Sequence, residues 1–289
     1  MIIVTHPERP RGLVWLASYP KSGNTWLRMF LYQMMRIQNG HPQEADEINK
    51  LDRASGYEAK LYGLFERHLG KTLDRATFDE AMQVREKVQQ DVFDRMPTVA
   101  LLKTHNLWGQ VGGASTVNQK VTVGVIYVVR DPRDVAISLA KYMGASIDAA
   151  IGVMNTSAYM TGNDHETAAE LWGSWSEHVM SWTMLEHDAS LIVRYEDMLG
   201  KPTETFTKIV KHLRQDATPE QISEAIALSS FDKLKAQEDA TPFRENSDRA
   251  ERFFVTGKSG GWRDKLSAEQ AKRIEDAHRQ QMTKHGYLN

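Results

Sequence analysis

The chain has 289 residues, of which 41% are hydrophobic and 26% are charged, a balance typical of soluble globular proteins. Its formal net charge of −2 argues against a general affinity for nucleic acid or anionic membranes, and the absence of cysteine excludes disulfides and thiolate metal sites. No apolar run approaches the roughly 20 residues that a membrane span needs, and the N-terminus lacks the pattern of a signal peptide. We therefore expect a cytoplasmic protein without a nucleic-acid or membrane partner.

The first predicted unit is a strand, a tight polar loop and a helix. An apolar run predicts a buried strand at residues 12–17, and Pro20 and Gly23 punctuate the loop that follows. From Asn24 onward, apolar residues recur at three- and four-residue steps, which indicates one face of a helix. The Asn-Gly-His-Pro sequence at residues 39–42 ends this helix.

This unit can hold an anion, because the free N–H groups and the dipole of a helix start favour negative charge. Lys21 would add a full positive charge, and three neighbouring side chains can bond phosphate oxygens: Ser22, Asn24 and Thr25. An ordinary strand-to-helix connection with a surface lysine explains the spacing equally well. The loop is not a Walker A motif, because its lysine precedes its only glycine.

Strands and helices alternate along the rest of the chain. Further strands are predicted at residues 98–105, 121–129 and 190–194. Helices are predicted at residues 74–94, 131–143, from 146, 166–186, 202–213, 219–228 and from 267. Loops are expected at residues 43–71 (with one short helix), 107–120 and 239–252, the last charged and mobile. This order predicts an α/β fold, with residues 1–289 forming a single domain around a central parallel sheet flanked by helices.

In such sheets ligands bind beyond the carboxyl ends of the strands, so the residues that follow the strands are candidates for a site. Lys103 and His105 lie two apart at one strand end, where they face the same way and can supply a positive charge and a proton acceptor. A histidine in such a place is more often a surface or satisfied residue, but the adjacent lysine favours a function.

A second anion site is indicated after the strand at residues 121–129. Arg130 follows the strand directly, and Ser138 lies two turns along the next helix, so a guanidinium and a hydroxyl meet near a helix start. The alternative is that Arg130 pairs with Asp131 or Asp134 and that Ser138 is a surface residue.

These segments resemble a known family. Tyr19-Pro-Lys-Ser-Gly-Asn-Thr-Trp26 resembles the 5′-phosphosulfate loop of sulfotransferases that use 3′-phosphoadenosine 5′-phosphosulfate (PAPS). Residues 125–138 are similar to the family's 3′-phosphate motif, residues 103–105 to the segment with the catalytic base, and residues 194–197 to a further block. Residues 257–263 resemble the glycine-rich segment that closes over the 3′-phosphate end.

The resemblance implies the roles of individual residues. It implies His105 as the base and Lys21 and Lys103 as the charges that act on the leaving and transferring groups. The donor-binding residues would be Lys21, Ser22, Gly23, Asn24, Thr25, Trp26, Arg130, Ser138, Tyr195, Phe231, Gly257 and Lys258, with Trp26 and Phe231 around the adenine.

One departure concerns the basic pair that the family usually carries before the first glycine of its C-terminal segment. Val255 and Thr256 stand there in this chain, and Lys258 or Arg252 is the candidate replacement. The segment that mediates dimers in animal members is also altered, so the resemblance implies no oligomeric state.

The implied reaction is in-line transfer of a sulfuryl group from PAPS to a hydroxyl, or alternatively an amine, on a P-loop-like core and without a metal. The acceptor pocket would be lined by residues 57–65, 107–113, 147–159 and 239–254, whose aromatic and Met side chains suit an apolar or aromatic small molecule.

Two alternatives stay open. A P-loop kinase would explain the strand, loop and helix and Arg130, but it requires a Mg²⁺ site and a second loop glycine. A non-catalytic nucleotide-binding protein on the same scaffold is the other alternative. The joint presence of Lys21, Lys103 and His105 argues against it.

Overall fold

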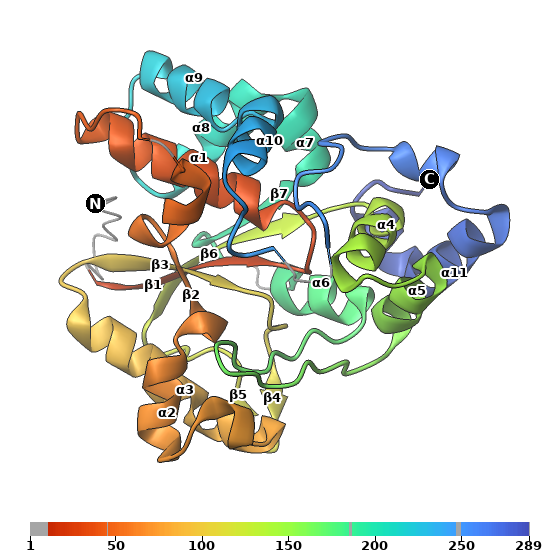
Figure 1. Cartoon of the computed structure of the whole chain (residues 1–289), viewed down its shortest axis with the longest axis horizontal. Coiled ribbons are helices and arrows are strands. Elements are labelled where there is room, and N and C mark those ends of the chain that lie inside the picture. Colours follow the sequence, from red (N-terminus) through yellow and green to blue (C-terminus); the bar gives the residue numbers. More distant parts are fainter. Residues whose placement is uncertain (1–10, 45, 185–186, 247–249, 289) are drawn as a thin grey trace.

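The computed structural model describes residues 11–44, 46–184, 187–246 and 250–288. A five-stranded sheet runs through it in the order β2-β3-β1-β6-β7, and each neighbouring pair is parallel (Figure 1). The strands are β1 (Gly12–Ser18), β2 (Gly56–Tyr57), β3 (Val99–Thr104), β6 (Thr122–Val129) and β7 (Ser190–Arg194). A separate hairpin consists of β4 (Gln110–Val111) and β5 (Ala114–Ser115).

The helices fall into α-helices and shorter 3₁₀ turns. The α-helices are α1 (Asn24–Gln38), α2 (Tyr62–Leu69), α3 (Phe78–Arg95), α4 (Pro132–Met143), α5 (Ile147–Asn155), α6 (Trp175–Thr183), α7 (Tyr195–Gly200), α8 (Pro202–His212), α9 (Pro219–Leu228), α10 (Phe231–Ala240) and α11 (Ala268–Lys284). The 3₁₀ turns are η1 (Glu47–Arg53), η2 (Glu58–Lys60), η3 (Leu73–Arg75) and η4 (Gly261–Asp264). Within the described residues, no helix combines the length and the apolar character that a membrane crossing requires.

Strand β1 is central because its side chains are apolar on both faces. Leu13, Trp15 and Ala17 join the core cluster that includes α4, α5, α6 and α11, whereas Val14 and Leu16 join the cluster with α1, α8 and α9. Helices therefore cover both faces of the sheet, as Figure 1 shows. The α/β fold with a central parallel sheet is confirmed, and the loop after β1 lies in the middle of the sheet's carboxyl edge.

Most predicted elements are present, but the helix expected at residues 166–186 is wrong over its first half. Helix α6 begins only after Ser174, whose side chain forms a capping box with Glu177, and Gly173 has a φ of 62° that ends helical geometry before it. The preceding residues run as an extended segment that carries the buried Glu170. The last two residues of the expected helix lie outside the described residues.

The loop expected at residues 239–252 also differs from the prediction. Helix α10, which the sequence did not indicate, extends to residue 240, and residues 247–249 lie outside the described part. The expectation of a mobile loop does not suit the part before them, because Phe243 is buried and Glu245 forms ion pairs with two cations. Strand β2 and the β4–β5 hairpin were likewise read as loop.

A buried ion pair ties the extended segment to the rest of the fold. Arg85 on α3 and Glu58 on η2 are both fully buried, with 3.2 Å between Nη1 and Oε2. Arg85 also donates from Nη2 to the carbonyl oxygen of Ala169, 2.5 Å away, and Gln89 donates to Glu58. This cluster fixes the position of the chain just before Glu170.

We predict that Arg85→Met lowers the free energy of unfolding by about 3–5 kcal/mol, because it leaves Glu58 buried without its charged partner. Urea titration followed by circular dichroism measures the change. Lys87→Met is the matched control, because Lys87 is exposed on the same helix and should change stability little. A cost for Arg85→Met as small as that of the control would contradict this role.

Candidate active site

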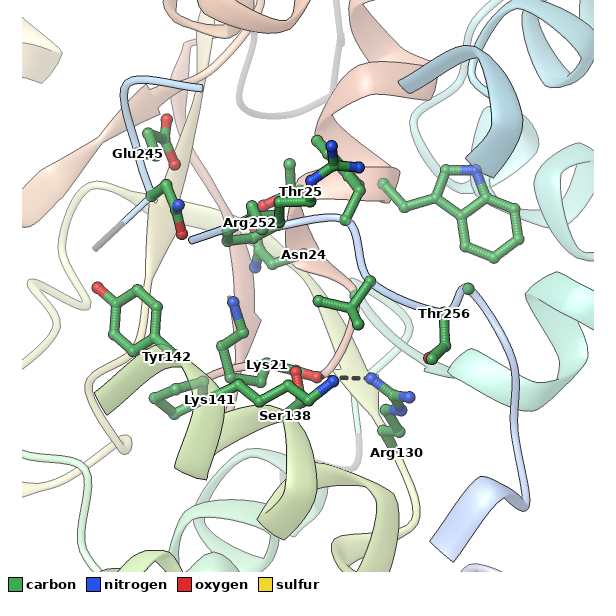
Figure 2. A pocket seen from close by; sticks show the side chains of 18 of the residues that line it. Lys21, Asn24, Thr25, Arg130, Ser138, Lys141, Tyr142, Glu245, Arg252 and Thr256 are labelled. Atoms are coloured by element: carbon green, nitrogen blue, oxygen red, sulfur yellow. Dashed lines mark hydrogen bonds between the residues drawn. The ribbon is translucent and has the colours of Figure 1, made fainter. Parts of the chain in front are cut away.

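A cavity of about 840 Å³ opens at the carboxyl edge of the sheet. It brings together residues that were predicted from separate segments: Lys21, Gly23, Asn24, Thr25, Trp26, Lys103, His105, Arg130, Ser138, Tyr195, Phe231, Gly257 and Lys258. Figure 2 shows Glu245 at one end of this cavity and Arg130 and Thr256 at the other. Ser22 is fully buried behind the wall and does not line the cavity.

The loop between β1 and α1 needs a glycine where it meets the helix. Gly23 has a φ of 103°, and a Cβ there would lie 2.5 Å from the Tyr195 ring. Asn24 closes the loop by donating from Nδ2 to the Leu16 carbonyl oxygen, 2.8 Å away. Helix α1 has no side-chain cap, which leaves its first N–H groups available to an anion.

Lys21 places its ammonium against two aromatic rings instead of a carboxylate. Its Nζ lies 3.6 Å from the ring centroid of Phe253 and 4.6 Å from that of Tyr142. Burial lowers the pKa of Lys21 to about 7, and the nearby charges of Lys103 and Arg130 act in the same direction. An anion bound beside Lys21 would restore its full charge.

Lys103 is buried and has a carboxylate partner. Its Nζ lies 3.0 Å from Glu245 Oε2 and 3.8 Å from the ring centroid of Tyr57. Burial lowers the pKa of Lys103, whereas the charge of Glu245 opposes that shift.

The hydrogen bonds of His105 fix its tautomer. Nδ1 lies 2.8 Å from the carbonyl oxygen of Ser18, which can only accept, so Nδ1 carries the proton and Nε2 keeps a lone pair. Burial, helped by Lys103, holds the pKa of His105 well below its usual range. His105 is therefore neutral at physiological pH, as a proton acceptor must be.

Three buried groups hold His105 in place. The backbone N–H of His105 donates to Glu170 Oε1 at 2.9 Å, and the backbone carbonyl oxygen of His105 accepts from His178 Nε2 at 3.0 Å. Tyr127 in turn bonds His178 Nδ1 at 2.9 Å. Glu170 also accepts from the hydroxyl of Tyr57, so one buried carboxylate orders both the candidate base and an aromatic wall of the cavity.

Arg130 joins the first loop to the C-terminal glycine segment. It donates from Nη1 to the Lys21 carbonyl oxygen at 3.0 Å and from Nη2 to the Lys258 carbonyl oxygen at 3.2 Å, and its guanidinium lies 4.2 Å from the ring centroid of Tyr195 (Figure 2 marks the first bond). Within the described residues, Arg130 Nε and Ser22 Oγ are buried without a hydrogen-bond partner. Such orphaned donors fit a site that an anion completes.

The two aspartates considered as partners of Arg130 have other roles. Asp131 caps α4 and forms an ion pair of 2.8 Å with Arg133. Asp134 accepts from the N–H groups of Gly260 at 2.6 Å and Trp262 at 2.9 Å. Asp134 therefore holds the C-terminal segment against α4, and this use of an acid was not predicted.

The C-terminal segment also needs a glycine. Gly257 has a φ of 57°, and a Cβ there would lie 2.3 Å from Phe231. Lys258 and Arg252, the candidates for the missing basic pair, both line the cavity with exposed side chains, and Arg252 forms an ion pair of 2.8 Å with Asp239.

Two of the four segments that were expected to line the acceptor pocket line this cavity. Residues 57–65 and 239–254 contribute to the cavity wall, but 107–113 and 147–159 do not. The first of these forms part of the β4–β5 hairpin, and the second lies mostly in α5, which packs on α4 and α11. Residues 164–167, the last two of which were expected in a helix, line the cavity instead.

Comparisons with known proteins identify the family of this chain. A family model described as a sulfotransferase domain matches residues 11–286. Sulfotransferase 1A1 of Rattus norvegicus is 26% identical over 269 residues, which cover 91% of this chain and 81% of the relative. Sulfotransferase 1 family member D1 of Mus musculus is 25% identical over 95% of this chain and 84% of the relative.

Solved structures share the fold. Retinol dehydratase in complex with androsterone and inactive cofactor PAP has a TM-score of 0.64 at 22% identity, covering 97% of this chain and 83% of that one. A mouse sulfotransferase complexed with PAP has a TM-score of 0.62 at 19% identity, covering 97% and 86%. Because the family model spans nearly the whole sequence, the chain belongs to the sulfotransferase family.

Proposed function

We propose that this sulfotransferase moves the sulfuryl group of PAPS to a hydroxyl of a small-molecule acceptor, or alternatively to an amine, and releases adenosine 3′,5′-bisphosphate (PAP). One observation carries the proposal: the cavity holds an anion-binding loop, a second guanidinium site and a neutral histidine with a free Nε2. The family match and the PAP named in the relatives' structures support this donor. The family match also favours this reaction over the P-loop kinase.

Two anion sites would bind the two phosphate positions of the donor. The first N–H groups of α1 and Lys21 would hold the 5′-phosphosulfate, with Asn24 and Thr25 beside them and Ser22 behind the cavity wall. Arg130 and Ser138 would hold the 3′-phosphate, because they line the cavity next to the C-terminal glycine segment. Lys258 is the candidate for an additional charge there.

Aromatic side chains between these sites would bind the adenosine. Trp26 packs edge-on against Tyr195, with 5.8 Å between ring centroids, and Phe231 contacts the segment at Gly257. All four residues line the cavity, and flat rings of this kind are suited to stack on a purine.

The chemistry would follow from the protonation states. The acceptor oxygen attacks sulfur while His105 Nε2 takes its proton, and the bond from sulfur to the bridging phosphate oxygen breaks to release PAP. Lys21 would offset the charge that develops on the leaving phosphate, and Lys103 would offset the charge on the sulfuryl oxygens. Positioning and electrostatics would supply most of the rate, as in phosphoryl transfer.

The acceptor would be a small molecule with apolar or aromatic character. Tyr57, Tyr142 and Trp172 line the cavity, and the ring centroid of Tyr57 lies 5.9 Å from that of His105. Retinol and androsterone, which two of the similar solved structures contain, are largely apolar molecules that carry a hydroxyl group.

A metal-free reaction, a cytoplasmic location and a single domain over residues 1–289 stay predictions, as does the absence of a nucleic-acid partner.

The direct test is to incubate the protein with PAPS labelled in the sulfuryl group and a panel of phenols, alcohols and amines. Label in the acceptor together with released PAP is expected. Tight binding of PAP without turnover on any acceptor would favour the non-catalytic alternative, and Mg²⁺-dependent turnover of ATP would favour the kinase.

We predict that His105→Ala abolishes measurable sulfuryl transfer but keeps donor binding, because the side chain bonds the Ser18 carbonyl oxygen and leaves the loop's N–H groups untouched. Single-turnover kinetics measure the transfer, and calorimetry with PAP measures binding. Native turnover in the variant would show that His105 is not the base.

Lys21→Ala should lower kcat by about a hundredfold or more, the scale for losing one preorganised charge at a developing anion. Lys60→Ala is the control, because Lys60 lines the same cavity but lies near Glu166 at its rim. Equal effects of the two substitutions on kcat would refute the role of Lys21.

The affinity for PAP should depend on pH through Lys21. Its pKa of about 7 means that the ammonium is charged below pH 7 and loses its proton above it, while a bound phosphate favours the charged form. PAP affinity should therefore be constant below pH 7 and fall above it, by at most about tenfold per pH unit. Calorimetry across this range checks the slope. If PAP affinity still falls above pH 7 in Lys21→Ala, the pH dependence comes from another group.

A further inference from the structure

Glu245 occupies a place in the cavity that neither the motifs nor the proposed roles account for. It comes from the loop after α10, far in sequence from the strand ends, and its carboxylate accepts two hydrogen bonds of 2.7 Å from Nη1 of Arg28. The same carboxylate accepts from Lys103 Nζ at 3.0 Å. One acid is thus shared by two cations, and the side chains of Arg28 and Lys103 are only 1% and 8% exposed.

We propose that Glu245 is the positioning residue for Lys103: it holds the lysine ammonium at the carboxyl end of β3 and keeps it charged for the transfer step. This inference rests on the proposed role of Lys103 in stabilising the sulfuryl oxygens. Glu245 itself need not touch the reacting atoms, because it acts through Lys103.

The surroundings of Lys103 explain why it needs such a partner. The charged and titratable groups that face it are Arg28 from α1, Lys21 from the first loop, Tyr57 from β2, His105 after β3, Glu170 from the extended segment, and Glu245. Burial and the charges of the other cations favour a neutral lysine. Glu245 is the acid in direct contact with it, and it opposes both effects.

The charge balance of the cluster suits an anionic substrate. Arg28 and Lys103 together exceed the charge of Glu245 by one, so a positive charge remains for the sulfuryl group. Arg28 is anchored on its other side by donating to Ser55 Oγ at 2.9 Å and to the Ser55 carbonyl oxygen at 3.1 Å. Nη1 of Arg28 bonds both carboxylate oxygens and so fixes the carboxylate, and the carboxylate in turn fixes Lys103.

The competing explanation is that Glu245 only fastens its loop to the core. A fastening role would lower activity equally at every pH and whichever cation stands at position 103. A role in keeping Lys103 charged would make the loss grow with pH, and this pH dependence would disappear when the cation at position 103 cannot lose its proton.

The experiment compares Glu245→Gln in two backgrounds, one with Lys103 and one with Lys103→Arg. The quantity is kcat/KM for PAPS at about pH 6 and about pH 9, which reports protonation in the free enzyme. Arginine stays protonated across this range, and any contribution of Lys21 is common to both backgrounds and cancels. Melting temperatures establish that each variant is folded.

We expect the loss caused by Glu245→Gln to grow at least tenfold between the two pH values in the Lys103 background, because removing an adjacent opposite charge shifts a pKa by about 1–3 units. In the Lys103→Arg background the loss should not change with pH. Equal, pH-independent losses in both backgrounds would overturn the inference and leave only the fastening role.

Two controls separate this result from other failures. Glu166→Gln makes the same change elsewhere in the cavity wall, and should add no pH dependence in either background. If Glu245→Gln alone does not fold, Arg28→Met combined with Glu245→Gln removes the orphaned arginine and carries the same comparison. A wild-type protein without turnover of PAPS would instead refute the proposed function.

Discussion

The site depends on the burial of several positive charges at one edge of the sheet. Lys21 and Arg130 follow β1 and β6, and Lys103 lies at the end of the neighbouring strand β3, so their repulsion cannot be relieved by moving apart. Aromatic faces, backbone carbonyl oxygens and the carboxylate of Glu245 stabilise them in the free protein. A donor with separated anionic groups would neutralise this cluster far better than those partners do, which would make the cavity selective for such a nucleotide.

The same crowding sets the protonation states that the reaction needs. Burial and neighbouring charge keep His105 neutral, while the Ser18 carbonyl oxygen fixes the proton on Nδ1. Glu170 and His178 hold the backbone of His105, so the proposed base is oriented by the core and not by the substrate. The proposed base and the positive charges are thus arranged before any ligand enters.

The sequence predicted the parts of the site that lie in local motifs. Gly23, Lys21 and Arg130 could be found because a turn, a helix start and a strand end each have a local pattern. Glu245 and Glu170 could not, because each acts through tertiary contacts with residues far away in sequence. Two errors in the predicted fold have related causes. Tryptophans at helical spacing favoured a helix across Gly173, where the backbone is not helical. The short edge strand β2 was missed because it depends on pairing with β3.

We expect the cavity to bind a nucleotide with two separate phosphate positions. Calorimetric titration of the protein with PAP, adenosine 5′-monophosphate and ATP under identical salt and pH measures this preference. PAP should bind at least about tenfold more tightly than adenosine 5′-monophosphate, because only PAP reaches Arg130 and the loop together. Equal affinities for PAP and adenosine 5′-monophosphate, or a preference for ATP, would contradict it.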